Sequence, residues 1–165
     1  MNKVNSLTRG GIYVALTICF VYLSSVLPTS KLSLMTIASA IIPFSILTTN
    51  VKTSISVYIT SSLLCLLLGL RGMGIAYILF FGIYGIIKYY IEKLRKFIIE
   101  YLLKIIFFNL CFFVIYNFAT LIFTDLIKIK LSMFYIVIAM QVVFLIYDYA
   151  LTMIISYMKH RLLKF

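Results

Sequence analysis

Long, uninterrupted apolar stretches occupy most of the sequence, and they constrain the fold more than any other feature. A helix needs about 20 mostly apolar residues to cross the hydrocarbon core of a bilayer. A membrane β-barrel would instead show alternating apolar and polar residues along each strand. The chain is therefore predicted to be all-α, a polytopic integral membrane protein with six transmembrane helices in a compact bundle. The expected helices form a single membrane domain, 1–165, and lie at about 11–27, 32–49, 53–70, 73–90, 105–123 and 133–158.

Composition supports this class and excludes several functions. Hydrophobic residues make up 64% of the chain and charged residues 12%, against about 25% charged residues in soluble domains. The net charge of +11 is interpreted as a topology signal, because the basic residues border apolar stretches and no nucleic-acid motif is present. Cys19, Cys65 and Cys111 lack metal-ligand spacing and are expected to pack as small residues. Because no catalytic constellation, metal cluster or phosphate loop is found, the sequence predicts no enzyme, no metal site and no cofactor.

Turn residues set the helix ends in the first half of the chain. Pro28 follows the first apolar stretch, Gly69 and Gly72 free the backbone after the third, and Pro43 is expected to kink the second. The first stretch also fits a signal peptide. No cleavage site follows it cleanly and five more apolar stretches do, so it is interpreted as a retained helix. No glycine or proline follows Gly85, so the later boundaries depend on charge alone.

The densest charge lies in residues 87–104, between the fourth and fifth apolar stretches. Five charges of alternating sign recur there every four residues, namely Lys88, Glu92, Lys96, Glu100 and Lys104. Opposite charges one turn apart stabilise a helix, so helix is expected on both sides of a turn. Because ionised side chains are costly in the hydrocarbon core, 91–104 is predicted to be a cytoplasmic connector. It is either a solvated link or a surface for a partner or anionic membrane lipid.

The basic residues are distributed unequally between the two sides of the membrane. With six helices, eleven lysines and arginines fall on the side of the termini, and only Lys31, Arg71, Lys128 and Lys130 fall on the other. Cytoplasmic loops carry the excess of basic residues. Both termini are therefore predicted to be cytoplasmic, in a multi-pass protein of the cell membrane.

Polar residues within the apolar helices are the candidates for function, because they are expensive in lipid and should face the bundle interior. Lys88, Asn109 and Asp148 lie about 21 to 23 Å below the outer face at 1.5 Å per residue. A Lys88–Asp148 pair supported by Asn109 is predicted at this depth. It is either an internal structural pair or, in a proton-coupled carrier, a relay at Asp148.

A second polar group lies nearer the outer face. It consists of Gln141 on the last predicted helix and Tyr116, Asn117 and Thr120 on the fifth. These residues either line a ligand pocket open to the outside or form interhelical hydrogen bonds, worth about 0.6 kcal/mol each on average.

Small residues recur on the first predicted helix, where Gly11, Ala15 and Cys19 lie four residues apart. Side chains of this size leave a shallow groove that another helix can approach closely. That helix would belong either to the bundle or to a partner.

The layout resembles the substrate-binding S components of energy-coupling factor (ECF) vitamin transporters. The resemblance depends on the basic N-terminus, the small residues of the first helix, the KLSL segment before Pro43 and the sequence FFGIYGIIKYYIEK. It implies a small solute bound from outside and delivered with a transmembrane scaffold subunit and ATPase subunits. The family docks through an alanine stripe on its first helix, which Ala15 matches and from which Gly11 and Cys19 depart.

On this interpretation the solute is vitamin-like, and Gln141, Asn117, Tyr116 and Thr120 contact it while Arg71 attracts an anionic group. A weaker resemblance is to the rod-shape protein MreD, a six-helix basic membrane protein of similar length. It implies a scaffold of cell-envelope or wall synthesis without a transport substrate. A transporter subunit should bind a ligand and copurify with an ATPase module, whereas a scaffold should do neither.

Overall fold

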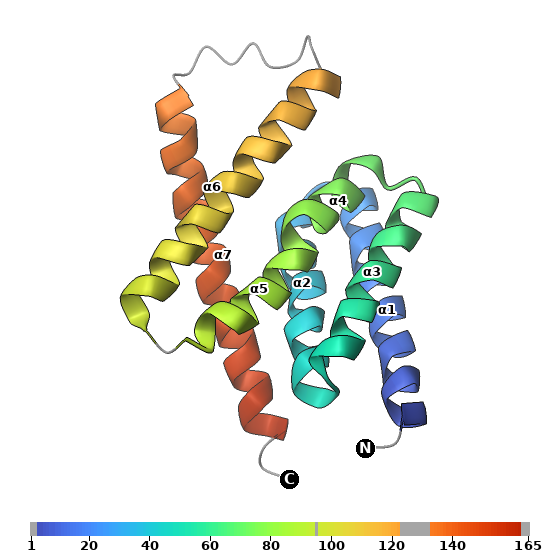
Figure 1. The fold of residues 1–165 in the computed structure, drawn as a ribbon. Coiled ribbons are helices and arrows are strands. Elements are labelled where there is room, and N and C mark those ends of the chain that lie inside the picture. The colour runs from blue at the N-terminus through green and yellow to red at the C-terminus, as the bar shows by residue number, and fades with distance from the viewer. Residues whose placement is uncertain (1–2, 95, 123–132, 163–165) are drawn as a thin grey trace. The chain divides into compact units, whose positions relative to one another are not determined.

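The computed structural model describes residues 3–94, 96–122 and 133–162, without the side chains of residues 3, 71, 97, 116, 118–122, 133–136 and 161–162. Every regular element in these ranges is helical, which confirms the all-α prediction. Figure 1 shows α1 (Lys3–Val26), α2 (Lys31–Thr48), α3 (Val51–Leu67), α4 (Arg71–Ala76), the π-helix η1 (Tyr77–Gly82), α5 (Ile83–Glu92), α6 (Phe97–Ile122) and α7 (Met133–Leu162).

Within the described residues, five helical stretches are long and apolar enough to cross a membrane, as expected for a multi-pass membrane protein. They are Val4–Val26, Lys31–Thr48, Gly72–Glu92, Ile98–Ile115 and Val137–His160. The remaining helix, α3, is also apolar, but its 17 residues fall below the 18 that the other five reach. Each of the six predicted ranges thus contains helix, while a sixth membrane crossing stays a prediction.

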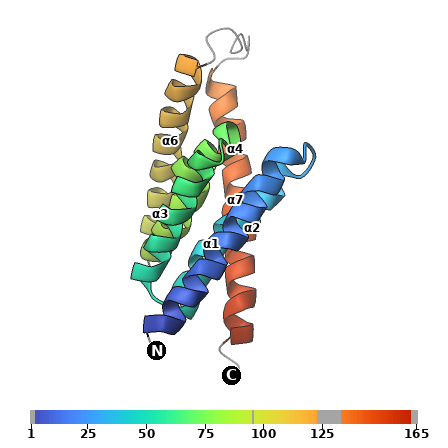
Figure 2. The ribbon, with the colours of Figure 1, turned by 90° about the vertical axis from the view of Figure 1, so that its right-hand side faces the viewer.

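The chain divides into two compact units. Unit 1 comprises Met1–Tyr90 and Ala150–Phe165, and unit 2 comprises Ile91–Tyr149. Within unit 1, α1 packs against α2 and α3, and η1 packs against α2 and α3 as well (Figure 1 and Figure 2). Within unit 2, α6 contacts the first part of α7 through the stacked rings of Phe108 and Phe144.

Hydroxyl side chains fill much of the interior of unit 1. Residues with 0% exposure include Thr17, Ser24, Ser39, Ser45, Ser54 and Ser61. Many of these hydroxyls donate to a carbonyl of their own helix, as Thr17 does to Tyr13 O at 2.8 Å. They are therefore buried without losing a hydrogen bond, and their small size lets the helices approach closely.

Pro43 lies inside α2, as predicted, and it shapes the contact with α5. Proline lacks the N–H that would bond to the carbonyl four residues earlier, which here belongs to Ser39. A Cβ added at Gly85 of α5 would lie 2.8 Å from Cδ of Pro43 and 3.2 Å from the Ser39 carbonyl oxygen. Only a residue without a side chain fits there, so Gly85 lets the α5 backbone pack directly on α2.

The turn after α3 depends on Gly69, whose φ of +68° lies in the left-handed region. The N–H of Gly69 donates to Leu66 O at 3.0 Å, and the N–H of Leu70 donates to Cys65 O at 3.2 Å. These two bonds form a Schellman motif, which satisfies the last carbonyls of the helix. The predicted glycine turn is confirmed at this position.

The charged stretch forms helix on both sides of a short turn, as its alternating charges predicted. α5 ends at Glu92 and α6 begins at Phe97, eight residues before the predicted start at 105. Lys104 belongs to the predicted connector, and its side chain is buried in α6, with 4% of the residue exposed. Burial is possible because carboxylates surround its ammonium group.

Candidate functional site

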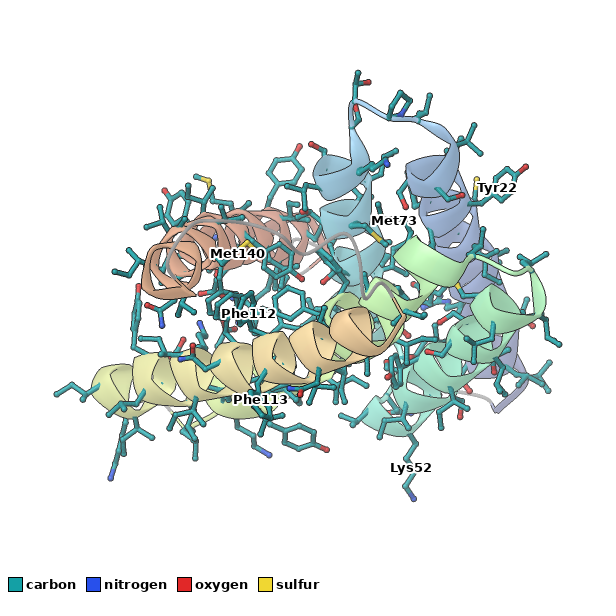
Figure 3. The ribbon with its side chains drawn as sticks, turned by 90° about the horizontal axis from the view of Figure 1, so that it is seen from above. Tyr22, Lys52, Met73, Phe112, Phe113 and Met140 are labelled. Carbon is teal, nitrogen blue, oxygen red and sulfur yellow. The ribbon has the colours of Figure 1, made fainter. Side chains whose placement is uncertain are left out.

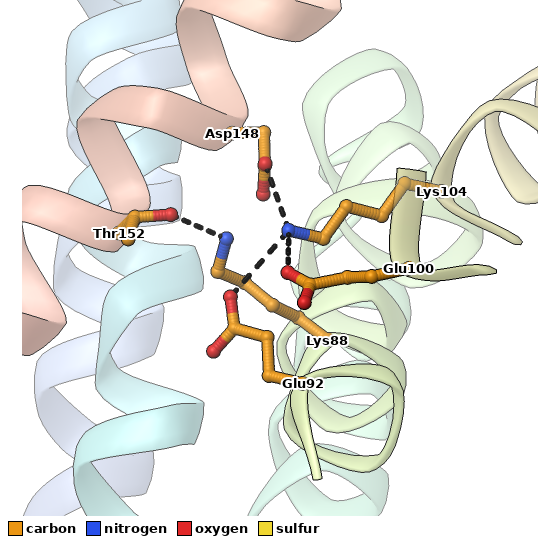
Figure 4. Close-up of polar contacts among 6 residues, drawn as sticks. All are labelled: Lys88, Glu92, Glu100, Lys104, Asp148 and Thr152. Carbon is orange, nitrogen blue, oxygen red and sulfur yellow. Dashed lines mark hydrogen bonds and ion pairs between the residues drawn. The ribbon is translucent and has the colours of Figure 1, made fainter. Parts of the chain in front are cut away.

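Three of the four acidic residues in the chain contact a single lysine in unit 2. Nζ of Lys104 lies 2.9 Å from Oε1 of Glu100, 3.0 Å from Oδ2 of Asp148 and 3.5 Å from Oε1 of Glu92 (Figure 4). We refer to these four residues as the Lys104 cluster. It brings together the end of α5, the first turns of α6 and the middle of α7.

Local helix geometry positions each member of the Lys104 cluster. Glu100 and Lys104 lie one turn apart on α6, so their side chains meet on the same face. Glu92 is the last residue of α5. Asp148 reaches Lys104 from α7 across 44 residues of sequence. The cluster therefore fixes the ends of two helices against the middle of a third.

The carboxylates of the cluster differ in their access to solvent. The side chains of Glu92 and Glu100 are 34% and 21% exposed, so water can solvate part of their charge. The side chain of Asp148 is 10% exposed and that of Lys104 is 5% exposed. Taking charges out of water is unfavourable unless they are closely paired. The Lys104–Asp148 ion pair is thus shielded from water, whereas the two glutamates lie on the more solvent-exposed side of the cluster.

Aromatic rings adjoin the Lys104 cluster along both helices. Phe108 follows Lys104 by one turn on α6, and Phe144 precedes Asp148 by one turn on α7. Their rings stack with centroids 4.6 Å apart, and Phe144 is 2% exposed. This apolar layer excludes water from one side of the ion pair and so strengthens its electrostatic attraction.

Each residue of the predicted inner polar group, Lys88, Asn109 and Asp148, has a described contact with a residue outside that group. In unit 1, Nζ of Lys88 donates to Oγ1 of Thr152 at 2.7 Å (Figure 4). The same Nζ lies 5.9 Å from the ring centroid of Tyr84. In unit 2, Asp148 contacts Lys104. Nδ2 of Asn109 donates to Ile105 O of its own helix at 3.1 Å. Pairing of Lys88 with Asp148 stays a prediction.

Sequence reasoning missed Lys104 as a member of the site. The available signal was the four-residue spacing of Glu100 and Lys104, which allowed α6 to begin early. The contact with Asp148 depends on how α6 and α7 pack, and residue spacing along the chain does not contain that information.

The outer polar residues lie at or near the surface of unit 2 where their side chains are described. Asn117 is exposed, and its Nδ2 donates to Phe113 O of the same helix at 2.7 Å. Gln141 on α7 is half-buried. The side chains of Tyr116, Thr120 and Arg71 lie outside those described, so the predicted solute pocket stays a prediction.

The predicted stripe on α1 lies on its outward face. Gly11, Ala15 and Cys19 are all exposed, whereas Thr17 and Val21 of the same helix are fully buried. A Cβ added at Gly11 would meet no atom within 4 Å. The groove left by these small residues is therefore open and is not used to pack α1 within unit 1.

No known protein-family model matches the chain, and no curated protein or solved structure is detectably similar to it. A functional assignment therefore depends on the residues of this chain.

Proposed function

We propose that this protein is the solute-binding membrane subunit of an ATP-driven uptake system, similar to the S components of ECF transporters. It binds a small, vitamin-like solute from the outer side of the cell membrane. A transmembrane scaffold subunit and ATPase subunits, which this chain does not encode, would then drive delivery of the solute.

The observation that supports this proposal best is the exposed stripe of Gly11, Ala15 and Cys19 on α1. Large apolar side chains border it, with Ile12 54% exposed and Leu16 44% exposed. Close helix contacts in membranes form where small residues let two backbones approach. A groove of this kind on the outside of unit 1 suits a helix of another subunit.

The solute would bind between α6 and α7 near their outer ends. Gln141, Asn117, Tyr116 and Thr120 are assigned to solute contact, and Arg71 is assigned to attracting an anionic group. Amide and hydroxyl groups at this level provide the few polar contacts that orient a small molecule in an otherwise apolar site. Lys88, Asn109 and Asp148 are assigned to the protein interior, since Asp148 already contacts Lys104.

The test is a mild-detergent purification of the tagged full chain from its native membrane, with mass spectrometry of both proteins and small molecules in the eluate. An ATPase pair with a scaffold subunit, or a bound vitamin-like compound, is expected. Copurification with wall-synthesis proteins and no small molecule would overturn the proposal and favour a scaffold similar to MreD.

A further inference from the structure

Charge is strongly segregated between the two units. Unit 1 contains no aspartate or glutamate, because all four acidic residues of the chain lie within 91–149. It nevertheless contains nine basic residues, namely Lys3, Arg9, Lys31, Lys52, Arg71, Lys88, Lys159, Arg161 and Lys164. The exposed cations of unit 1 therefore have no side-chain carboxylate within their own unit to neutralise them.

Two of these cations flank one turn of unit 1. Nη1 of Arg9 lies 3.5 Å from Thr48 O, at the end of α2. A Cβ added at the next residue of α1, Gly10, would lie 3.3 Å from Cγ2 of Thr53 in the first turn of α3. α1 thus touches both sides of the α2–α3 turn, with Arg9 beside Thr48 on one side and Gly10 beside Thr53, the residue after Lys52, on the other.

Both cations remain available to an external anion. Arg9 and Lys52 are exposed, and the side chain of Lys52 extends away from the helices (Figure 3). Among the residues that the structure describes, no carboxylate contacts either side chain. A guanidinium has five N–H donors and an ammonium three, so the bond to Thr48 leaves most of them free. Both kinds of cation form charge-assisted hydrogen bonds to phosphate oxygens.

If α2 crosses a bilayer, its length would place Arg9 and Lys52 near the headgroup level. α2 has 18 residues and is therefore about 27 Å long, close to the hydrocarbon thickness of about 30 Å. Its end at Thr48, which Arg9 contacts, would lie at the membrane surface. Three residues further into the helices, Ile12 and Ile55 are 54% and 37% exposed. These apolar side chains offer a surface to an acyl chain directly below the cations.

We propose that Arg9 and Lys52 form a binding site for the headgroup phosphate of an anionic phospholipid. The site needs only that α1 and α2 lie in a membrane, and it does not depend on solute uptake. A phospholipid bound there would hold unit 1 at a fixed depth in the membrane, on the membrane side where the described part of α1 begins.

Lipid binding to the purified full chain tests the site directly. Phosphatidylglycerol or phosphatidylcholine is titrated into the protein in mild detergent, while bound lipids are counted by native mass spectrometry and the melting temperature is recorded. We expect one tightly bound phosphatidylglycerol and a higher melting temperature with this lipid than with phosphatidylcholine. Arg9→Gln with Lys52→Gln should weaken phosphatidylglycerol binding by at least about tenfold.

Matched variants separate a site from general charge attraction. Lys31→Gln with Lys159→Gln removes the same charge from residues of unit 1 outside the proposed site and should leave binding within about twofold, because screened surface charges contribute little on their own. Equal losses in both double variants would overturn the proposal, and so would equal binding of the two lipids. If the Arg9/Lys52 double variant fails to fold, the single changes Lys52→Gln and Arg9→Lys are compared. Arg9→Lys should retain more binding than Lys52→Gln.

The source of the phosphate is tested in the same preparation. Inorganic phosphate at the same concentration should not raise the melting temperature, because it lacks the acyl chains that pack below the cations. Equal stabilisation by free phosphate, or an acidic protein bound in place of lipid, would contradict a lipid site.

Discussion

Nζ of Lys104 lies 3.0 Å from Oδ2 of Asp148, and neither side chain is more than 10% exposed. The contact joins α6 to α7 within unit 2. Two further carboxylates share the same ammonium group, at 2.9 Å from Glu100 and 3.5 Å from Glu92. Lys104 is therefore the common partner of the three carboxylates. Lys104 and Asp148 should contribute unequally to the unfolding free energy of unit 2.

Removing the cation should destabilise unit 2 more than removing one anion. Lys104→Met leaves three carboxylates without their common partner and should cost about 3 to 5 kcal/mol of unfolding free energy. Asp148→Asn leaves Glu100 bound to Lys104, so a smaller loss of about 1 to 3 kcal/mol is expected. Denaturant unfolding in detergent measures both. The ordering is contradicted if Asp148→Asn proves at least as harmful as Lys104→Met.

A double-mutant cycle separates the possible partners of Asp148. The double variant Lys104→Met with Asp148→Asn should lose less unfolding free energy than the two single variants together. The difference should exceed about 0.5 kcal/mol. The same cycle with Lys88→Met tests the predicted Lys88–Asp148 pair, and additive losses there would argue against it. Glu92→Gln serves as the control, because a carboxylate that is 34% exposed should contribute no more than about 1 kcal/mol.

The close approach of Gly85 to α2 predicts a second stability effect. A Cβ at Gly85 would lie 2.8 Å from the Pro43 ring and 3.2 Å from a backbone oxygen, and neither can move without shifting a helix. Gly85→Ala should therefore cost about 1 to 3 kcal/mol. Gly72→Ala is the matched control, since no atom lies within 4 Å of its added Cβ. The same melting-temperature shift in both variants would show that steric contact is not the cause.

Helix positions could be read from the sequence because apolar length is a local property. Every predicted range contains helix, and Gly69 forms the predicted turn because a positive φ strongly favours glycine. The burial of Lys104 in the first turns of α6 could not be predicted, because it depends on Asp148, 44 residues away. The cost of burying a charge cannot be estimated from the local sequence when its partners are distant.

The same limit applies to the candidate site. The exposure of Gly11, Ala15 and Cys19 depends on which face of α1 packs inward, and the four-residue spacing left both faces possible. The contact between Tyr58 and the π-helix also had no sequence signal, since π-helical hydrogen bonding is not encoded in apolar periodicity.

The hydroxyl of Tyr58 should stabilise η1. It donates to Ile78 O at 2.8 Å, a carbonyl within the π-helix, where hydrogen bonding is irregular. Tyr58→Phe removes this donor and should cost about 1 to 2 kcal/mol. Tyr22→Phe is the control, because Tyr22 is 53% exposed and its hydroxyl can bond to water. Denaturant unfolding in detergent measures the stability of both variants. Equal stability of Tyr58→Phe and Tyr22→Phe would show that this hydrogen bond does not stabilise η1.

The proposed solute pocket predicts a loss of binding without a loss of fold. Gln141→Ala and Asn117→Ala should each weaken solute binding by at least about tenfold if their amides contact the solute. The melting temperature should change little, because Asn117 is exposed and Gln141 is half-buried. Val142→Ala, at an exposed neighbour on α7, should leave binding unchanged. Unaltered affinity in both amide variants would refute this placement of the pocket.

The stripe on α1 predicts a defect in assembly alone. Ala15→Leu would fill the groove beside Gly11 and Cys19, so a partner helix could no longer approach closely. Because Ala15 is exposed, the larger side chain should leave both the melting temperature and solute affinity unchanged. Copurification of the scaffold and ATPase subunits should be lost. Ala139→Leu makes the same change at an exposed alanine of α7 and should retain the partners. Partners that still copurify with Ala15→Leu would exclude α1 as the docking surface.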